Sequence, residues 1–290
     1  MDMKINSPFR YAGGKFYARN LILEHIQPHD TYIEVFAGGG SIFFAKNKAK
    51  RNWLNDIDNE LVNCYTIIRD RPQELIELLK GEQALKERHH FFKNEYQPSN
   101  ELERAYRWFY LNRTSYSGIM NMKNCYWGYG DKFSMRPENW ANNIMRTSLK
   151  LQGVELTCLD FETLIDNLPE NENIFLFLDP PYFNADQDKF YAHFFSNEDH
   201  IRLQNVLLKN QHKFNFLLTY DNTEEVRTLY NWTSVMLDKE WNYTINRTDD
   251  QSKNGKTKPK KDKGVRYKGK EVFILNYQTQ TLAEKQLALF

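Results

Sequence analysis

The chain has 290 residues, 41% of them hydrophobic, and a formal net charge of +1 at pH 7. This length suits one large domain or two smaller ones, and a near-neutral charge predicts no partner by itself. The three cysteines, Cys64, Cys125 and Cys158, are far apart and odd in number, which argues against a disulfide framework or a zinc site and favours reduced thiols in a cytoplasmic protein. The N-terminal stretch shows no signal peptide, and no apolar run approaches the length of a membrane helix.

A glycine pair followed by a lysine stands near the N-terminus, where residues 9–15 read FRYAGGK. A phosphate-binding loop would need a second spaced glycine and a Ser or Thr after the lysine, so we reject that interpretation. We expect a tight turn here, followed by a helix over residues 17–25. Such a turn also allows the backbone to approach a ligand closely.

A strand, a glycine turn and a helix are predicted within TYIEVFAGGGSIFFAK, residues 31–46. We place the strand at 32–37, the turn at 38–40 and the start of the helix at Ser41. This order is the first half of a nucleotide-binding βαβ unit, although three glycines alone are also typical of a flexible turn.

The next predicted strand, residues 51–55, ends in the acidic cluster Asp56-Ile57-Asp58. Asp56 lies 16 residues past Gly40, which suits a carboxylate that accepts hydrogen bonds from ribose hydroxyls. The glycine turn and this acid together predict a cofactor site.

Helical patterns continue over residues 59–117. Pro72 suits a first helical position, and Ser99 is placed to cap a helix with acidic residues in its first turn. The irregular stretch that follows is rich in aromatic and basic residues. It indicates either a surface that presents side chains to a partner or an ordinary packed loop. Residues 63–145 are therefore predicted to be a subdomain inserted into an α/β chain.

The α/β alternation then resumes and is punctuated by acidic residues. Five apolar residues, 174–178, form an uninterrupted run typical of a strand buried on both faces. Asp179-Pro180-Pro181-Tyr182 follows, and its prolines end the strand. A carboxylate, a rigid turn and an aromatic ring thus stand at a carboxyl strand end, where open α/β sheets bind ligands, although a plain surface turn is the alternative. The remaining predicted strands are 154–159, 212–219, 233–245 and 265–277, and the remaining helices are 196–208 and 222–230.

Positive charge is concentrated in one segment, residues 246–270, which holds ten Lys or Arg against three Asp. A charge run of this kind is often a solvated loop. In a nearly neutral protein it also favours contact with a nucleic-acid backbone.

Six motifs in order, FRYAGGK, EVFAGGGS, NDIDNEL, NRTSYSGI, CLDF and LDPPY, resemble the Dam-type (D12 class) adenine-N6 DNA methyltransferases over nearly the whole chain. The resemblance implies a Rossmann-like α/β methyltransferase core over 1–62 and 146–290, a helical target-recognition subdomain over 63–145, and S-adenosylmethionine as methyl donor. After Arg113 the chain departs from the NRTGYNGL or NRxGFNGL typical of GATC-specific members. The resemblance therefore predicts the chemistry but not the recognition sequence.

The predicted site residues fall into three sets, and no metal is expected. Motif positions imply a cofactor set of Tyr11, Lys15, Glu34, Phe36, Gly38, Asp56, Asp160, Phe161 and Asp179, and a catalytic set of Asp179, Pro180 and Tyr182. The predicted DNA-binding residues, taken from the motif position of Arg10, the irregular stretch and the basic segment, are Arg10, Arg113, Ser115, Tyr116, Asn121, Lys123, Asn124, Arg136, Lys258, Lys260 and Lys261.

The predicted reaction follows from the weak nucleophilicity of the adenine amino group. Hydrogen-bond acceptors on Asp179 and Pro180 would favour its attacking form, and Tyr182 would stack on a base flipped out of the duplex. No Pro-Cys pair exists, which argues against a cytosine-C5 methyltransferase. An RNA adenine-N6 or DNA cytosine-N4 methyltransferase and a catalytically silent DNA-binding relative remain as alternatives. We expect a monomer that binds double-stranded DNA and does not bind a membrane. A restriction endonuclease acting on the same site is one candidate partner, and the sequence leaves open whether the enzyme pairs with such a nuclease, acts alone or comes from a phage.

Overall fold

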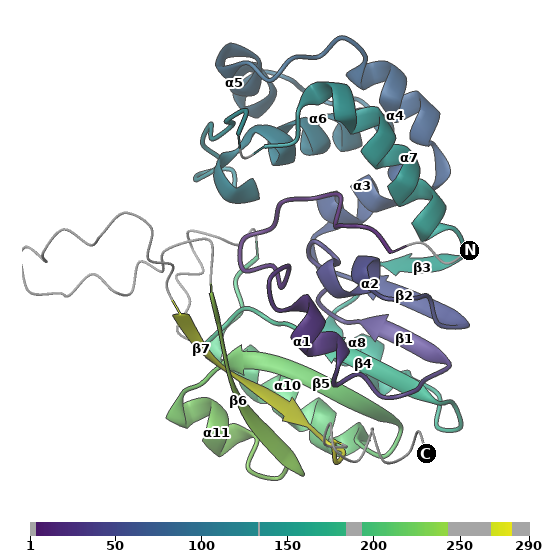
Figure 1. Ribbon diagram of the computed structural model, residues 1–290, viewed down its shortest axis with the longest axis vertical. Helices are drawn as coiled ribbons and strands as arrows, with labels where there is room; N and C mark the ends of the chain where they lie inside the picture. Colours follow the sequence, from purple (N-terminus) through teal and green to yellow (C-terminus); the bar gives the residue numbers. More distant parts are fainter. Residues whose placement is uncertain (1–3, 133, 184–192, 243–267, 280–290) are drawn as a thin grey trace, which may run out of the picture.

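The computed structural model describes residues 4–132, 134–183, 193–242 and 268–279 (Figure 1). Within this part, seven strands form one sheet in the order β3-β2-β1-β4-β5-β7-β6. The five strands from β3 to β5 are parallel, and β7 is antiparallel to both β5 and β6. This confirms the predicted Rossmann-like α/β fold with a mostly parallel sheet. The strands are β1 (Thr31–Glu34), β2 (Arg51–Asn55), β3 (Val154–Thr157), β4 (Ile174–Leu178), β5 (Phe214–Asp221), β6 (Val235–Asn242) and β7 (Lys268–Leu275).

Strands β1 and β4 lie at the centre of the sheet, and every residue of both is buried. The chain leaves β1 toward β2 and β3 on one side, and it leaves β4 toward β5 on the other side. The strand order therefore reverses between β1 and β4. In open α/β sheets, ligands bind outside the carboxyl ends of the strands at this reversal.

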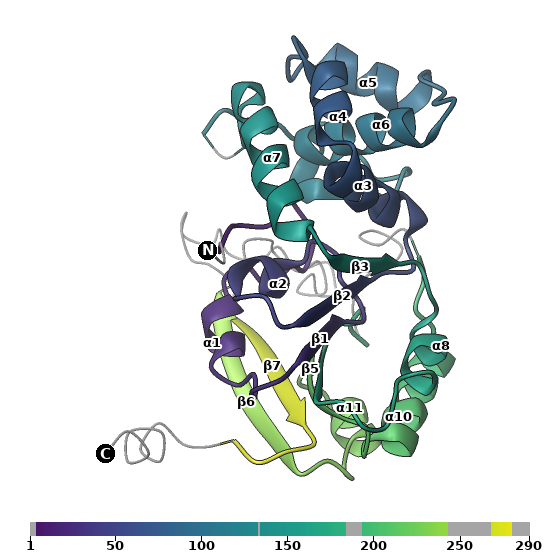
Figure 2. The ribbon, with the colours of Figure 1, turned by 90° about the vertical axis from the view of Figure 1, so that its right-hand side faces the viewer.

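Helices cover both faces of the sheet, as Figure 2 shows. Alternate residues of β4 point to opposite faces, so Phe175 packs in one core cluster and Leu176 in the other. The helices α1 (Arg19–Leu23) and α2 (Ser41–Ala45) cover the first face. The second face is covered by α8 (Phe161–Asp166), α10 (Asn197–Asn210) and α11 (Glu224–Leu229).

Five further helices form a group beyond the β3 edge of the sheet (Figures 1 and 2). Buried aromatic side chains make its core, with the rings of Phe92 and Tyr110 stacked at 4.5 Å. Phe9, from the N-terminal segment, packs against Trp108 with their ring centroids 4.6 Å apart, and this contact ties the segment to the helical group. The helices are α3 (Asn59–Asp70), α4 (Pro72–Leu79), α5 (Lys86–Asn94), α6 (Glu101–Thr114) and α7 (Trp140–Leu151), with the short 3-10 turns η1 (Tyr116–Gly118) and η2 (Pro137–Asn139).

The helix boundaries confirm the predicted start at Pro72 and correct the predicted cap at Ser99. Helix α4 begins at Pro72, and Ser196 caps α10 in a reciprocal capping box with Asp199. The predicted cap at Ser99 is wrong, because Asn100 is the residue directly before α6 and its side chain accepts the Glu103 N–H at 3.0 Å. Ser99 lies one residue before this cap. None of the helices in the described ranges is long and apolar enough to cross a membrane.

Candidate active site

Asp179 follows β4 directly and is bound by two neighbouring side chains. The Lys15 ammonium nitrogen lies 2.6 Å from Oδ1 and 2.8 Å from Oδ2, and the Thr219 hydroxyl of β5 donates to Oδ1 at 2.7 Å. The side chains of Lys15 and Asp179 are only 3% and 18% exposed. Since water is largely excluded, removing either partner would leave a buried uncompensated charge. The sequence assigned Lys15 to the cofactor, and the structure brings it to the predicted catalytic acid.

The segment after Asp179 is held by residues of β5 and β7. Tyr182 is 8% exposed, its hydroxyl donates to the Glu271 carboxyl, and the Lys15 ammonium lies 4.8 Å from its ring centroid. The backbone N–H of Phe183 donates to Asp221 Oδ1 at 3.2 Å. Pro180 is buried between these contacts. The turn is thereby fixed at its carboxylate, its backbone and its ring.

The glycine turn after β1 lies against Tyr11. Gly38 has a φ of 47°, and a Cβ added there would lie 2.9 Å from the Tyr11 ring. Glycine is needed for both reasons, since it accepts a positive φ and leaves room for the ring. The Gly38 carbonyl accepts a hydrogen bond from the Tyr65 hydroxyl at 2.9 Å, and this bond ties the turn to α3.

Asp56 follows β2 and faces the glycine turn. Its two oxygens accept the backbone N–H groups of Gly38 at 2.8 Å and Asp58 at 3.0 Å. Burial raises the pKa of Asp56 to about 6. Each oxygen keeps a second lone pair that can accept a further hydrogen bond. Asp58 instead caps α3, where its side chain accepts the N–H groups of the first turn.

Glu34, the last residue of β1, is bound inside the fold. Its Oε1 accepts the Tyr32 hydroxyl at 2.9 Å and the Phe43 N–H at 2.5 Å. Burial raises the pKa of this carboxyl to about 8. Glu34 therefore joins the end of β1 to the start of α2.

Three phenylalanines form an aromatic cluster beside this edge of the sheet. The ring centroids of Phe36, Phe161 and Phe195 lie 5.6 to 5.8 Å apart. Asp160 caps α8 by accepting the Glu162 N–H at 3.0 Å. Phe195 was absent from the predicted site residues, because no local pattern connects it with residues more than thirty positions away.

Among the predicted DNA-binding residues, Arg10 and Arg113 are bound within the protein. Asn112 exchanges two hydrogen bonds with the backbone of Arg10, and the Arg10 guanidinium donates to Ser134 Oγ at 3.2 Å. Arg113 is 4% exposed and donates to the Pro8 carbonyl at 2.9 Å, and burial lowers its pKa to about 10. Both residues lie where the N-terminal segment meets α6.

The other members of this predicted set differ in exposure. Tyr116 is 56% exposed and Lys123 is exposed, whereas Asn121 and Asn124 are half-buried and Ser115 is buried. The remaining three, Lys258, Lys260 and Lys261, lie outside the described residues.

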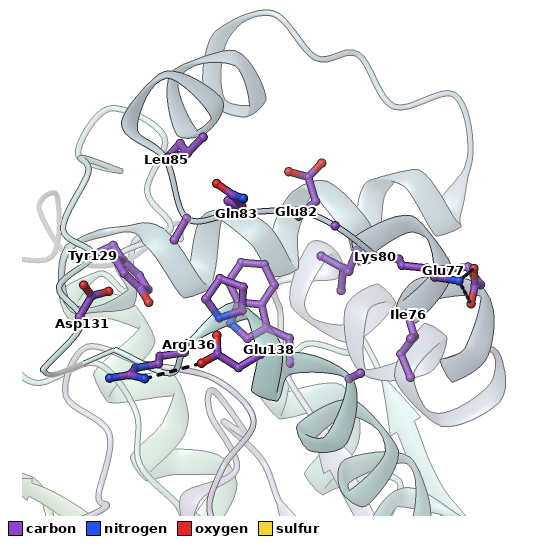
Figure 3. Close-up of a pocket in the computed structure, with 16 residues that line it drawn as sticks. Ile76, Glu77, Lys80, Glu82, Gln83, Leu85, Tyr129, Asp131, Arg136 and Glu138 are labelled. Carbon is purple, nitrogen blue, oxygen red and sulfur yellow. Dashed lines mark hydrogen bonds and ion pairs between the residues drawn. The ribbon is translucent and has the colours of Figure 1, made fainter.

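Arg136 borders a cavity of about 940 Å³ on the helical group. It forms a loose ion pair with Glu138 at 3.7 Å, and Asp131 and Tyr129 line the same cavity (Figure 3). The lining holds four acidic side chains, Glu77, Glu82, Asp131 and Glu138, against the basic Lys80 and Arg136, so its charge does not favour a phosphate backbone.

The sequence as a whole matches a known family. The model for the D12 class N6 adenine-specific DNA methyltransferases matches residues 11–277, a range that includes Tyr11, Asp56, Asp179 and Glu271. The chain belongs to this family. It is an adenine-specific DNA methyltransferase, and the family resemblance seen in its motifs is confirmed.

Three named relatives are similar to this methyltransferase, two of them over most of their length. The Type II methyltransferase M1.LlaDCHI of Lactococcus lactis subsp. cremoris is 28% identical over 240 residues, which cover 74% of this chain and 81% of the relative. The Type II methyltransferase M.MjaIII of Methanocaldococcus jannaschii is 26% identical over 69% of this chain and 78% of its own. The DNA adenine methylase of Escherichia coli K12 matches over a shorter range, being 32% identical over 123 residues, 40% of this chain and 44% of its own.

Proposed function

We propose that this methyltransferase transfers a methyl group from S-adenosylmethionine to N6 of an adenine that is flipped out of duplex DNA. The observation that supports the proposal is the arrangement at the strand reversal. Asp179 and Tyr182 follow β4, while Tyr11, the glycine turn and Asp56 surround the ends of β1 and β2. The site for the adenine that accepts the methyl group and the site for the methyl donor would then lie at the same edge of the sheet.

The side chains at the ends of β1 and β2 fit this cofactor. The Asp56 oxygens have lone pairs for ribose hydroxyls, and the cluster of Phe36, Phe161 and Phe195 offers aromatic faces for a purine ring. When bound, S-adenosylmethionine supplies a methyl group on a positively charged sulfur. Glu34 and Asp160 act through the backbone by fixing the starts of α2 and α8.

Asp179 would accept a hydrogen bond from the adenine amino group, and the Pro180 carbonyl would accept the second. Two acceptors favour a pyramidal nitrogen whose lone pair points at the methyl carbon. The Lys15 ammonium contacts both Asp179 oxygens, and Oδ2 keeps a second lone pair that can accept a hydrogen bond from the adenine. Thr219 holds Oδ1 and so keeps the carboxylate in place.

The chemical step then requires alignment more than activation. In the proposed transfer, the N6 lone pair would form the bond to the methyl carbon while the carbon–sulfur bond breaks and its electron pair stays on the departing sulfur. N6 also loses one proton, and the proposed acceptor of this proton is the adjacent Asp179 carboxylate. Holding the nucleophile in line supplies much of the rate enhancement, and no covalent bond to the protein is needed. Tyr182 would stack on the flipped base and offset part of the few kcal/mol that flipping costs.

The helical group is proposed as the target-recognition subdomain, with its core at 63–145. Tyr116, Lys123 and Arg136 are exposed and available for DNA, and the half-buried Asn121 and Asn124 lie on the same irregular stretch. Arg10, Arg113 and Ser115 lie where this stretch meets the N-terminal segment. We assign to Arg113 and Ser115 the positioning of that stretch, because both are buried.

The basic segment is proposed to contact phosphates through Lys258, Lys260 and Lys261. Asn242, the last residue of β6, pairs with Lys268, which is the first residue of β7 and itself belongs to the basic segment. Strand β7 runs antiparallel to β5, so this end of the β6–β7 pair lies at the carboxyl edge where Asp179 stands. The segment therefore joins the sheet on the proposed DNA side.

The cellular setting is also a proposal. Two relatives are named Type II methyltransferases, so a restriction endonuclease acting on the same site is a reasonable partner. We expect a cytoplasmic monomer.

The proposed function is tested with purified protein and labelled S-adenosylmethionine. Unmethylated duplex DNA, single-stranded DNA and RNA are compared as acceptors, and the product nucleosides are identified by mass spectrometry. We expect N6-methyladenine from duplex DNA, and sequencing of the modified bases would reveal the recognition site. N4-methylcytosine, or methylation of RNA alone, would replace the proposed function with one of the alternatives.

A further inference from the structure

Glu271, on β7, is a buried acid with an unusual set of contacts. It pairs in register with Asp221 of β5 and is 0% exposed. Its Oε2 accepts the Tyr182 hydroxyl, while its Oε1 has no hydrogen-bond partner in the part of the chain that the structure describes. A buried carboxyl with one satisfied oxygen lowers the stability of the fold. Core packing therefore gives no reason for an acid at this position.

The reason lies in the turn that β5 and β7 hold. Thr219 and Asp221 are two residues apart and so point to the same face of β5, where Thr219 binds Asp179 and Asp221 binds the Phe183 backbone. Glu271, from the neighbouring strand, binds the Tyr182 hydroxyl. Of these three anchors, the one from Glu271 reaches the tip of the ring.

We propose that Glu271 is a positioning residue for methyl transfer, which fixes the Tyr182 ring in the plane on which the target adenine stacks. This inference rests on the function proposed above, in which Tyr182 receives the flipped base. A ring held at its hydroxyl cannot swing about its Cα–Cβ bond without breaking the hydrogen bond. Stacking of a base on an aromatic side chain requires the two ring planes to lie roughly parallel and offset, so it depends on the orientation of the ring. The anchor thus acts after the base has left the duplex.

Four groups set the charge of Glu271: Tyr182, Lys15 from the N-terminal segment, Asp179 after β4, and Asp221 of β5. Burial raises its pKa to about 8, Lys15 and the Tyr182 hydrogen bond lower it, and the two aspartates raise it. Glu271 is therefore mostly protonated at pH 7. Because the folded-state pKa lies above the unfolded value, Glu271 favours folding at low pH. That contribution is lost as pH rises from about 4.5 through about 8.

The kinetic test uses Glu271→Ala, Glu271→Gln and Tyr182→Phe. Single-turnover methylation of unmethylated genomic DNA is measured at saturating S-adenosylmethionine. We expect Glu271→Ala to slow the rate about tenfold without weakening cofactor or DNA binding. This factor corresponds to losing part of the stacking free energy between the Tyr182 ring and the base. Glu271→Gln keeps an acceptor for the hydroxyl and should restore most of the rate. The Glu271→Ala, Tyr182→Phe double variant should be no slower than Tyr182→Phe, because both remove the same bond.

A second readout needs neither DNA nor cofactor. The melting temperature of Glu271→Gln minus that of the wild type should increase from pH 5 to pH 8, since only the wild type carries the titrating carboxyl at this position. Glu34 and Asp56, whose pKa values are also raised, are present in both proteins and cancel.

Different outcomes would overturn this inference and the proposed function. A wild-type rate in Glu271→Ala, an additive double variant, or a melting difference independent of pH would each overturn the role of Glu271. If Glu271→Ala does not fold, Glu271→Gln and Tyr182→Phe still decide the matter. Substantial activity in Asp179→Ala would overturn the proposed function itself, whatever the Glu271 variants show.

Discussion

The carboxyl edge of the sheet and the irregular stretch of the helical group use polar residues in opposite ways. At the edge, Asp179, Asp56 and Glu271 have little exposure and are tied to specific donors. On the helical group, Lys123 and Arg136 extend into solvent. Chemistry requires groups fixed before the substrate arrives, whereas reading DNA requires groups that can exchange water for bases or phosphates.

The N-terminal segment joins these two regions over a very short distance. Arg10 is bound to Asn112 and Ser134 of the helical part, and Lys15 is bound to Asp179. The N-terminal segment thus connects the helical group to the proposed catalytic acid between residues only five positions apart. The predictions below test how far the two regions are separate in function.

The largest effect is expected from Asp179→Ala. The variant should slow methyl transfer by about 100-fold or more, because it removes an acceptor that acts mainly in the transition state. Cofactor affinity should stay close to that of the wild type by titration calorimetry. Asp30→Ala is the matched control, since Asp30 pairs with Lys50 at the amino end of β1. More than about a tenth of the wild-type kcat in Asp179→Ala would contradict the assigned role.

A smaller effect is expected from Asp56→Ala, and it should change only the affinity for the cofactor. Removing hydrogen bonds from ribose hydroxyls to a carboxylate should weaken S-adenosylmethionine binding by about 1–3 kcal/mol. The rate at saturating cofactor and the affinity for DNA should change little. Unchanged affinity in calorimetry would move the ribose contact away from Asp56.

The sequence predicts the edge well where the signal is local. The apolar run that ends in Asp179-Pro180 lies within a few neighbouring residues, and Asp56 follows the glycine turn after only 16 residues. The structure places these stretches at adjacent strand ends. The partners of the turn were missed, because the Tyr182 to Glu271 bond joins residues 89 positions apart.

The position of β7 explains why no sequence pattern reveals Glu271. Strand β7 inserts between β5 and β6 in antiparallel register, which brings Glu271 opposite Asp221. In the sequence, Glu271 directly follows the basic segment, and charged residues in such surroundings are typical of an exposed surface. The wrong cap at Ser99 has a similar cause on a smaller scale, since Ser99 and Asn100 are both good capping residues and the backbone decides between them.

The recognition residues should show effects that depend on the DNA sequence. Arg136 pairs with Glu138 only loosely at the surface, so it can leave that pair at little cost. If it reads a guanine, Arg136→Ala should relax preference at one base pair by about 1–3 kcal/mol. Arg146→Ala, an exposed arginine on α7, is the control. Site preferences are measured by sequencing methylated bases in a random library, and an unchanged profile would exclude Arg136 as a reader.

The smallest effect on the saturated rate is expected from replacing Lys258, Lys260 and Lys261 together by alanine. Phosphate contacts set affinity and salt dependence but carry little sequence information, so all duplexes should bind more weakly to the same degree. The slope of log K against log salt should shrink by about 0.9 for each phosphate that a lysine no longer neutralises. Fluorescence anisotropy with a cognate and a scrambled duplex at several salt concentrations measures both quantities.

The matched control for this triple variant is Lys50→Ala with Lys209→Ala, two exposed lysines that pair with acids outside the proposed DNA side. The control should leave the salt slope unchanged. An unchanged slope in the triple variant would show that the basic segment does not contact phosphates. A loss confined to the cognate duplex would instead place base reading in this segment. The division of labour between the sheet edge and the helical group would then extend to a third region, because a strand connection of the catalytic core would share in recognition.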